Sequence, residues 1–279
     1  MKLVFCNSND KDHQNRLNAL LREVFFDFRF WYDLDLWDDR YESYAIADQD
    51  EIVSNICLYK TSVLYRNQRY DALSLGAVAT KPEYRGRGLL RQLMEQIDRK
   101  YAGVPMYLSA NDTVLDFYPH FGFRRFTEQL PICRQDIDHP VAPRRLSHDD
   151  PRVWQYIFNR VNFSSSFDCL NTEPVNLFHL YSGYLNDCLY ELQDINTLVV
   201  AQQNAATLKL FGVFSLQEIT WQDLAGRLPF SGIKRLEFGF MPYWPDLHYD
   251  LQADDSALWF VKNIACPLGA IKFPELSTT

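Results

Sequence analysis

The sequence predicts an α/β (α+β) protein built on a mixed, mostly antiparallel sheet, and the strongest support lies in the first half of the chain. Residues 73–80 form a short, nearly all-apolar run, which is typical of a strand covered on both faces. A turn with two glycines follows, and apolar residues then recur at helical spacing over 89–101. Residues 106–109 have the pattern of a further strand. A strand, a helix and a strand in this order form a crossover unit, whose two strands are parallel.

The chain before this unit predicts the antiparallel part of the sheet. Residues 3–6 have the length and composition of a strand, and residues 12–26 carry apolar side chains at helical spacing. Residues 44–47 and 52–65 predict two strands joined by a polar turn. A second polar turn leads into the crossover unit. Neighbouring strands connected in this way run antiparallel.

The remainder of the chain predicts a second, smaller α/β domain. After one more strand beyond Phe126, two prolines within four residues indicate a linker. We therefore expect a first domain at 1–137, a linker at 138–148 and a second domain at 149–279. The elements expected in the second domain are helices beginning at Pro151, Pro174 and Thr220 and strands at 189–192, 198–201, 208–214, 234–240 and 257–261.

Composition excludes several classes of protein. The 279 residues carry a net charge of −8, which disfavours nucleic acid as a partner, because binding to a polyanion relies on clustered Lys and Arg. We expect no membrane partner and a cytoplasmic location, because no apolar run approaches the roughly 20 residues of a membrane span. The six cysteines are scattered, with no Cys-x-x-Cys, so we expect free buried thiols and no metal site.

The glycine turn between the strand and the helix has the features of a phosphate site. The first amides of a helix lack partners within the helix, and the helix dipole adds partial positive charge there. Gly86 and Gly88 allow a ligand to approach the backbone closely. Local charge agrees, with four cations against one acid: Lys81, Arg85, Arg87, Arg91 and Glu83. The alternative is an ordinary turn that needs its glycines for backbone reasons. A P-loop hydrolase is excluded, because no Gly-Lys-Ser/Thr follows the turn.

These residues resemble the acyl-CoA-binding core of the GNAT superfamily of N-acetyltransferases. Arg85-Gly86-Arg87-Gly88-Leu89-Leu90 is similar to the family signature Arg/Gln-x-x-Gly-x-Gly/Ala, except that Leu90 stands where Gly or Ala is usual. Downstream, Asn111 and the run Phe117-Tyr118-Pro119-His120-Phe121-Gly122-Phe123 resemble the second signature. The similarity covers nearly the whole chain of a two-part bacterial subgroup, in which a degenerate GNAT-like domain follows the first.

The resemblance implies the GNAT fold, with splayed central parallel strands, and acetyl-CoA as the cosubstrate without a metal. The pyrophosphate would be held by amides of the glycine turn and the pantetheine arm by the edge of the strand that precedes it. The residues implied in cofactor binding are Val78, Ala79, Thr80, Arg85, Gly86, Arg87, Gly88, Leu89, Leu90 and Asn111. The alternative for Asn111 is a helix cap.

The resemblance also implies how the acetyl group would be transferred. The Ala79 amide would stabilise the thioester oxygen, and Tyr118, at the family's acid position, would protonate the leaving thiolate as catalytic acid. By spacing alone, Tyr118 would be a core tyrosine. The base stays open, because the strand 73–79 has no ionisable side chain. The candidates are Asp33, Asp35, Asp38, His120, the terminal carboxylate of Thr279 and a water chain.

An acidic and aromatic segment at 25–44 corresponds to the region that forms a wall of the acceptor pocket in GNAT folds. One interpretation is a lining for an amine, through charge and cation–π attraction. The other is that the aromatic residues are core and the acids are solvated. The candidate substrate-binding residues are Trp31, Asp33, Asp35, Trp37 and Asp38.

Two functions follow as hypotheses. The first is an acetyl-CoA-dependent N-acetyltransferase, acting on a primary amine of a small molecule or peptide by direct transfer in a ternary complex. The second is a catalytically weak acyl-CoA-binding sensor or interaction module, because no carboxylate lies on the central strand and Leu90 departs from the signature. The second domain lacks a phosphate turn, and its expected role is to close the acceptor pocket, to form a homodimer or to stabilise the first domain.

Overall fold

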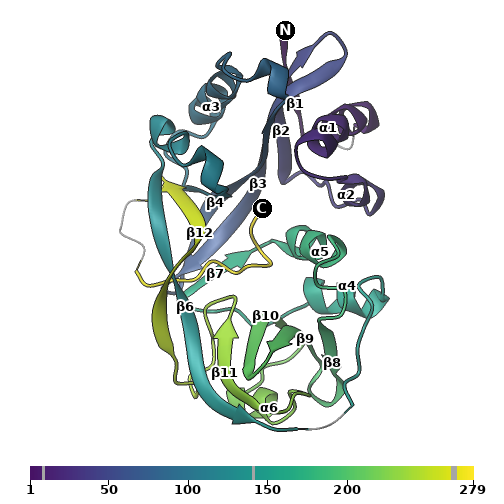
Figure 1. The fold of residues 1–279 in the computed structure, drawn as a ribbon, viewed down its shortest axis with the longest axis vertical. Helices are drawn as coiled ribbons and strands as arrows, with labels where there is room; N and C mark the ends of the chain where they lie inside the picture. Colours follow the sequence, from purple (N-terminus) through teal and green to yellow (C-terminus); the bar gives the residue numbers. More distant parts are fainter. Residues whose placement is uncertain (8–9, 140–141, 265–268) are drawn as a thin grey trace.

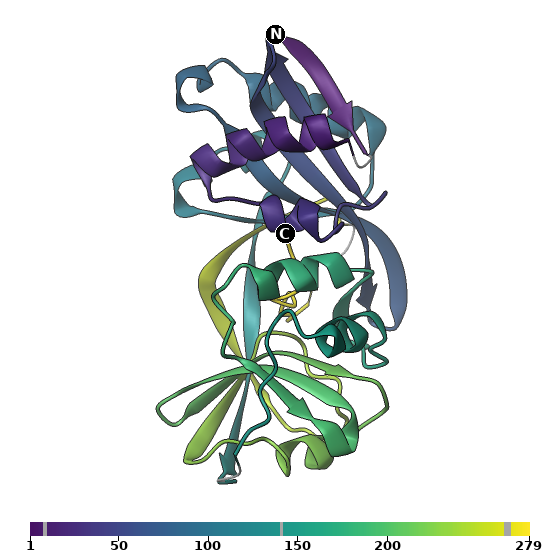
Figure 2. The same cartoon turned by 90° about the vertical axis from the view of Figure 1, so that its right-hand side faces the viewer.

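The computed structural model describes residues 1–7, 10–139, 142–264 and 269–279 of the chain (Figure 1). The molecule is elongated, with an N-terminal lobe within 1–123 and a C-terminal lobe within 142–249 (Figures 1 and 2). Two long strands, β6 (Arg124–Ile137) and β12 (Asp250–Lys262), run along both lobes.

The N-terminal lobe contains the elements that the sequence predicts and one further short helix. Its elements are β1 (Lys2–Cys6), α1 (Lys11–Val24), α2 (Arg29–Asp33), β2 (Tyr41–Asp48), β3 (Glu51–Tyr65), β4 (Gln68–Thr80), η1 (Pro82–Tyr84), α3 (Leu89–Lys100), β5 (Met106–Ala110), η2 (Asp112–Val114) and η3 (Tyr118–Phe121). The predicted strands and both long helices are confirmed, and α2 is the addition. The segment η3, which carries Tyr118, is a single 3₁₀ turn.

The C-terminal lobe also follows the prediction closely. Its elements are α4 (Pro151–Phe158), β7 (Phe167–Leu170), α5 (Glu173–Tyr181), β8 (Leu189–Leu192), η4 (Gln193–Ile195), β9 (Thr197–Asn204), β10 (Thr207–Ser215), α6 (Trp221–Ala225) and β11 (Ile233–Phe238). Asp150 caps α4 through a hydrogen bond from the Arg152 amide, and Thr220 and Asp223 form a capping box on α6. Among the described elements of this lobe, β7 and the 3₁₀ turn η4 have no counterpart in the prediction.

All these strands belong to one mixed sheet. Its order is β1-β2-β3-β4-β5-β12-β6-β11-β10-β9-β8, and β7 pairs with β3 outside this path. The pairs β4–β5 and β10–β11 are parallel, and the other pairs of the described strands are antiparallel, which confirms the mixed, mostly antiparallel sheet.

The expected domain division crosses this sheet. Strand β12 belongs to the expected second domain but lies between β5 and β6 of the first, and β7 pairs with β3. A single hydrophobic cluster joins Leu17 and Tyr59 of the N-terminal lobe to Leu177 and Leu198 of the C-terminal lobe. Residues 140–141 of the expected linker lie outside the described residues.

The two central parallel strands diverge soon after they meet. Strand β4 pairs with β5 only at Leu73↔Met106 and Ser74↔Tyr107, after which β5 pairs with β12 alone. Helix α3 covers one face of the N-terminal part of the sheet and α1 the other (Figures 1 and 2). The splayed strands expected from the sequence are therefore confirmed.

A local irregularity also lies beside the parallel pair of the C-terminal lobe, β10–β11. Strand β10 has a bulge between Leu210 and Gly212, next to its parallel pairing with β11. The segment near the end of the chain packs here, because the Glu275 amide donates to the Gly239 carbonyl at 2.8 Å and Leu276 lies against Gly212. The segment near the chain end thus packs directly beside the parallel pair of the C-terminal lobe.

Candidate active site

A cavity of about 960 Å³ lies at the gap between β4 and β5. Tyr118 and all ten residues that the sequence analysis assigns to cofactor binding line this one cavity. The two sequence motifs, which lie about 25 residues apart along the chain, are thus brought together in space. Within the described part of the chain no group of three or more His, Cys, Asp or Glu side chains is arranged to hold a metal ion.

The glycine turn is open to a ligand. Gly86 and Gly88 have φ of +74° and +72°, and a Cβ at either position would meet no atom within 4 Å. Along the chain from Gly86, the first backbone amide that donates a hydrogen bond to another described residue is that of Gln92. Its acceptor is the Gly88 carbonyl, at 3.2 Å. The preceding amides from Gly86 to Arg91 have no acceptor among the described residues, and all six residues line the cavity, as an anion site at a helix N-terminus requires.

Three arginines surround the turn, and none of them forms an ion pair with a described carboxylate. Arg85 donates to the Thr80 carbonyl at 3.2 Å, Arg87 donates to the Glu83 carbonyl at 2.8 Å and Arg91 lies over the Phe121 ring. All three side chains are exposed at the cavity. Their charges are available to a phosphate, so the residues present fit the pyrophosphate of a CoA thioester.

The edge of β4 that borders the cavity is bulged. Gly76 pairs with Cys57 and Ala79 with Asn55, so two residues of β4 face one of β3. Ala77 has a φ of +48°, which is unusual for a residue with a side chain. The Asn55 side chain donates to the Ala77 carbonyl at 3.0 Å and holds this conformation.

A chain of buried polar groups supports Asn55 from behind. The Ser43 hydroxyl donates to Asn55 Oδ1 at 2.7 Å, and His13 Nε2 lies 2.9 Å from Ser43 Oγ. Each of these three side chains is at most 1% exposed. Burial lowers the pKa of His13, so its imidazole is neutral near pH 7. Sequence reasoning missed this group, because none of its members belongs to a motif.

Tyr118 is held at the opposite wall of the cavity. It is 5% exposed and packs against Phe117, Phe123 and Phe260, with ring centroids 5.2, 5.9 and 5.4 Å away. Burial raises the pKa of Tyr118 to about 12. The phenol is thus fully protonated at neutral pH, which a proton donor requires. Asn111, which immediately precedes η2, also lines the cavity.

The residues expected to bind the acceptor do not line this cavity. Trp31 and Trp37 are 4% and 3% exposed and belong to the core, and Asp38 forms an ion pair with Arg40. Asp33 and Asp35 are exposed outside the described lining. From the same segment only Phe25 lines the cavity, together with Val24 before it.

Two of the candidate bases do line the cavity, namely His120 and Thr279. The Thr279 hydroxyl lies 2.6 Å from the Ser74 hydroxyl, beside Gly76. Helix α5 holds this segment: the Asn176 amide group donates to the Leu276 carbonyl at 2.5 Å, and His179 Nε2 lies 2.8 Å from the Thr278 carbonyl. The chain end, held by α5, thus contributes Thr279 to the cavity lining, and it lies between α2 and α5 in Figure 2.

Other expectations concern features outside the cavity. The cysteines that the structure describes are free and buried, and Cys266 lies outside the described residues. None of the described helices has the length and apolar character needed to cross a membrane.

The comparisons with known proteins agree with this geometry. Residues 8–126 match the family model of an acetyltransferase (GNAT) domain. Among solved structures, Eis1 from Mycobacterium abscessus has a TM-score of 0.59 at 15% identity, with 94% of this chain and 73% of that chain covered. A conserved protein of unknown function from Enterococcus faecalis V583 has a TM-score of 0.57 at 14% identity, with 94% and 72% covered.

A GCN5-related N-acetyltransferase from Kribbella flavida has a TM-score of 0.55 at 16% identity, with 93% of this chain and 70% of that chain covered. At such identities these likenesses concern the fold, and they extend over both lobes. A comparison with curated protein sequences finds no match. Residues 8–126 thus match an acetyltransferase (GNAT) domain, and the fold of the chain over both lobes is similar to that of the three solved structures.

Proposed function

We propose that the chain is an N-acetyltransferase that transfers the acetyl group of acetyl-CoA directly to a primary amine within a ternary complex. One observation carries the proposal: the open glycine turn, the bulged edge of β4 and the buried phenol of Tyr118 line the same cavity. An acyl-CoA site alone would need the first two features. Transfer of the acetyl group also requires an acid that protonates the leaving thiolate, and Tyr118 would supply that proton.

Each group of lining residues would have a separate role in the reaction. Unpaired amides of Gly86 to Arg91 and the three arginines would bind the pyrophosphate. The Ala79 amide, set by the bulge, would donate to the thioester oxygen as that oxygen gains negative charge. The amine nitrogen forms a bond to the carbonyl carbon, the carbon–sulfur bond breaks, and Tyr118 gives its proton to the leaving sulfur.

The amine must also lose a proton. His120 and the carboxyl end at Thr279 are the base candidates that line the cavity, and Asp33, Asp35 and Asp38 do not line it. A His120→Gln variant tests the first of them. An unchanged kcat would assign the proton to Thr279 or to water, whereas a loss with a retained affinity for acetyl-CoA would assign it to His120.

The transfer reaction is tested by the release of the CoA thiol from acetyl-CoA across a panel of primary amines. We expect turnover that falls about 100-fold or more in Tyr118→Phe, because the variant keeps the ring and loses only the proton donor. Tyr70→Phe, at an exposed position outside the cavity lining, is the control. Tight binding of acetyl-CoA without turnover of any amine would instead favour the sensor hypothesis.

The cosubstrate site is tested separately by calorimetry with acetyl-CoA. Gly88→Leu should weaken binding about tenfold or more, because a side chain would fill the open space in front of the amides. Gly103→Leu is a matched control, since Gly103 has a φ of +78°, has no neighbour within 4 Å and lies outside the cavity lining. Equal affinities in the two variants would contradict the assignment.

A further inference from the structure

The cavity has two walls of different chemical character. One wall carries the charged side chains of the lining. They come from the glycine turn, from the first turn of α3 and from the segment after β5. They are Arg85, Arg87, Arg91, Asp112 and Asp116. On the α1 side four of the lining side chains are apolar: Val24, Ala77 and Ala79 belong to the cluster around α1, and Phe25 lies at the end of that helix.

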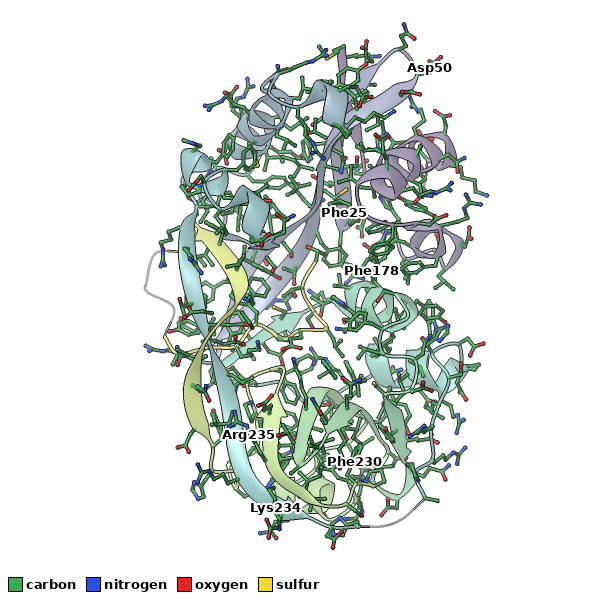
Figure 3. The ribbon with its side chains drawn as sticks, in the orientation of Figure 1. Phe25, Asp50, Phe178, Phe230, Lys234 and Arg235 are labelled. Carbon is green, nitrogen blue, oxygen red and sulfur yellow. The ribbon has the colours of Figure 1, made fainter. Side chains whose placement is uncertain are left out.

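Phe25 presents a large apolar surface to this cavity. Its side chain is 45% exposed, although its amide is fixed by a 2.7 Å hydrogen bond to the Leu21 carbonyl at the end of α1. An edge contact with Phe28, 6.4 Å between centroids, covers only part of the ring, and Phe28 packs in turn on Phe178 of α5. Figure 3 shows Phe25 and Phe178 near each other where the two lobes meet. An exposed aromatic ring in a cavity is a feature of ligand sites.

Two acids of the neighbouring segment, Asp27 and Asp38, have partners outside the cavity. Asp27 accepts hydrogen bonds from the Asn18 side chain at 2.8 Å and the Arg29 amide at 2.9 Å, and Asp38 is paired with Arg40. None of these residues lines the cavity. Apart from the single carboxyl end at Thr279, a polyamine or an aminoglycoside would find no described carboxylate on this wall to compensate for the lost hydration of its several ammonium groups.

We propose that the α1-side wall is the acceptor subsite, that it accepts the apolar and above all aromatic body of a monoamine, and that Phe25 determines this specificity. The proposal rests on the proposed function. The acceptor ring would pack edge-to-face or offset on Phe25, and its amino group would reach the gap past Ala77 and Ala79. Because α1 and α3 lie on opposite faces of β4, acceptor and cosubstrate would enter from opposite faces and meet at the gap.

The test compares 2-phenylethylamine with spermidine and kanamycin as acceptors. We expect kcat/KM for 2-phenylethylamine to exceed that for spermidine about tenfold or more. Phe25→Ala should raise the KM for 2-phenylethylamine about tenfold, with the KM for acetyl-CoA unchanged, and Phe25→Leu should recover part of the loss. A preference for spermidine or kanamycin would overturn the proposal.

The chain offers a matched control in the next residue. Phe26 is 46% exposed and stacks on Phe28 at 4.4 Å, but it does not line the cavity. Phe26→Ala should leave both KM values within about twofold of the parent. If Phe26→Ala and Phe25→Ala raise the acceptor KM equally, the subsite is not at Phe25.

The assays separate the acceptor subsite at Phe25 from the acetyltransferase reaction. Turnover of polycations alone would leave an acetyltransferase whose acceptor subsite lies elsewhere. If no amine is acetylated, 2-phenylethylamine is titrated calorimetrically into the CoA-saturated protein. Saturable binding that Phe25→Ala abolishes would support the subsite, and a lack of binding would overturn it, whatever the outcome for catalysis.

Discussion

At the residue scale, Asn55 is the side chain that sets the backbone at the cavity. It is fully buried, and it joins the Ala77 carbonyl of the bulge to the Ser43 hydroxyl behind it. In the proposed reaction the bulge aims the Ala79 amide at the thioester oxygen. Asn55 is thus a positioning residue rather than one that touches the reacting atoms.

Replacement of Asn55 by alanine should therefore affect turnover more than cosubstrate binding. Removal of a single oxyanion donor lowers kcat about 100-fold or more in known enzymes, and partial misplacement of the Ala79 amide should lower it about tenfold. The measurements are kcat and the calorimetric affinity for acetyl-CoA, which we expect to stay within about threefold.

The control is Asn162→Ala. Asn162 is buried in the C-terminal lobe and likewise links backbone groups, because it donates to the Val213 carbonyl and accepts from the Ser215 amide, both at 2.8 Å. Both variants should lose about 1–3 kcal/mol of unfolding free energy, since each leaves buried polar groups unpaired. An equal fall in kcat in the two variants would show that the effect comes from global stability.

The raised pKa of Tyr118 makes a prediction for the pH dependence of kcat. Because burial raises this pKa to about 12, the phenol keeps its proton throughout the range in which the protein can be assayed. At pH 10 only about 1% of it is ionised. We expect kcat to show no descending limb between pH 7 and 10 in a stopped assay of the acetylated product. A limb with a midpoint below pH 10 that disappears in Tyr118→Phe would refute this.

At the element scale, Thr279 reaches the cavity because α5 holds the segment 276–279 in place. Gly76 makes room for it: a Cβ on Gly76 would lie 2.9 Å from Thr279 Cβ and 3.0 Å from its Oγ1. Gly76→Ala should displace Thr279 and lower kcat/KM for the acceptor about tenfold, with little change in the affinity for acetyl-CoA.

A second substitution tests whether that clash is the cause. In Gly76→Ala combined with Thr279→Gly, the two clashing atoms are gone, so the activity lost in the single variant should partly return. The double-mutant cycle of kcat/KM measures the coupling between the two positions. Strict additivity would mean that Gly76→Ala acts through β4 itself and not through the chain end.

Local sequence patterns were sufficient to predict some of the helices. Helices α1 and α3 were predictable because 12 to 14 residues display a full apolar stripe, and α4 and α6 because their caps are local. Helix α2 and strand β7, with five and four residues, are too short to show a period, and α2 has no side-chain cap that would mark its start. Strand β7 depends on its pairing with the end of β3, 100 residues earlier.

At the scale of the whole molecule, the two lobes share a sheet and a core. Strand β12 separates β5 from β6, and Leu276 packs in the same cluster as Leu17 and Leu177. Cooperative units follow buried contacts rather than sequence order. We therefore expect the full chain to unfold in a single thermal transition, seen at the same temperature by circular dichroism and by tryptophan fluorescence.

The same contacts predict the behaviour of a chain cut after residue 137. Without β7 and β12, the facing edges of β5 and β6 lose their partner, and the cluster around α1 is uncovered. We expect this fragment to aggregate or to lack a cooperative transition, and co-expression with 142–279 to restore solubility. A soluble, monomeric fragment with a sharp transition would instead support two independently folding domains.

The sequence by itself determined the class of fold, the glycine turn and the position of Tyr118, because each depends on residues that are close along the chain. Only the tertiary structure decided which side chains of the acidic and aromatic segment at 25–44 line the cavity. In the segment after α1, Trp31 and Trp37 turn into the core and Phe25 turns to the cavity. Side chains of such similar hydrophobicity are sorted by the surfaces they meet, and here those surfaces come from β4, α5 and the chain end. Contacts between residues so far apart along the chain leave no local sequence pattern from which they could be predicted.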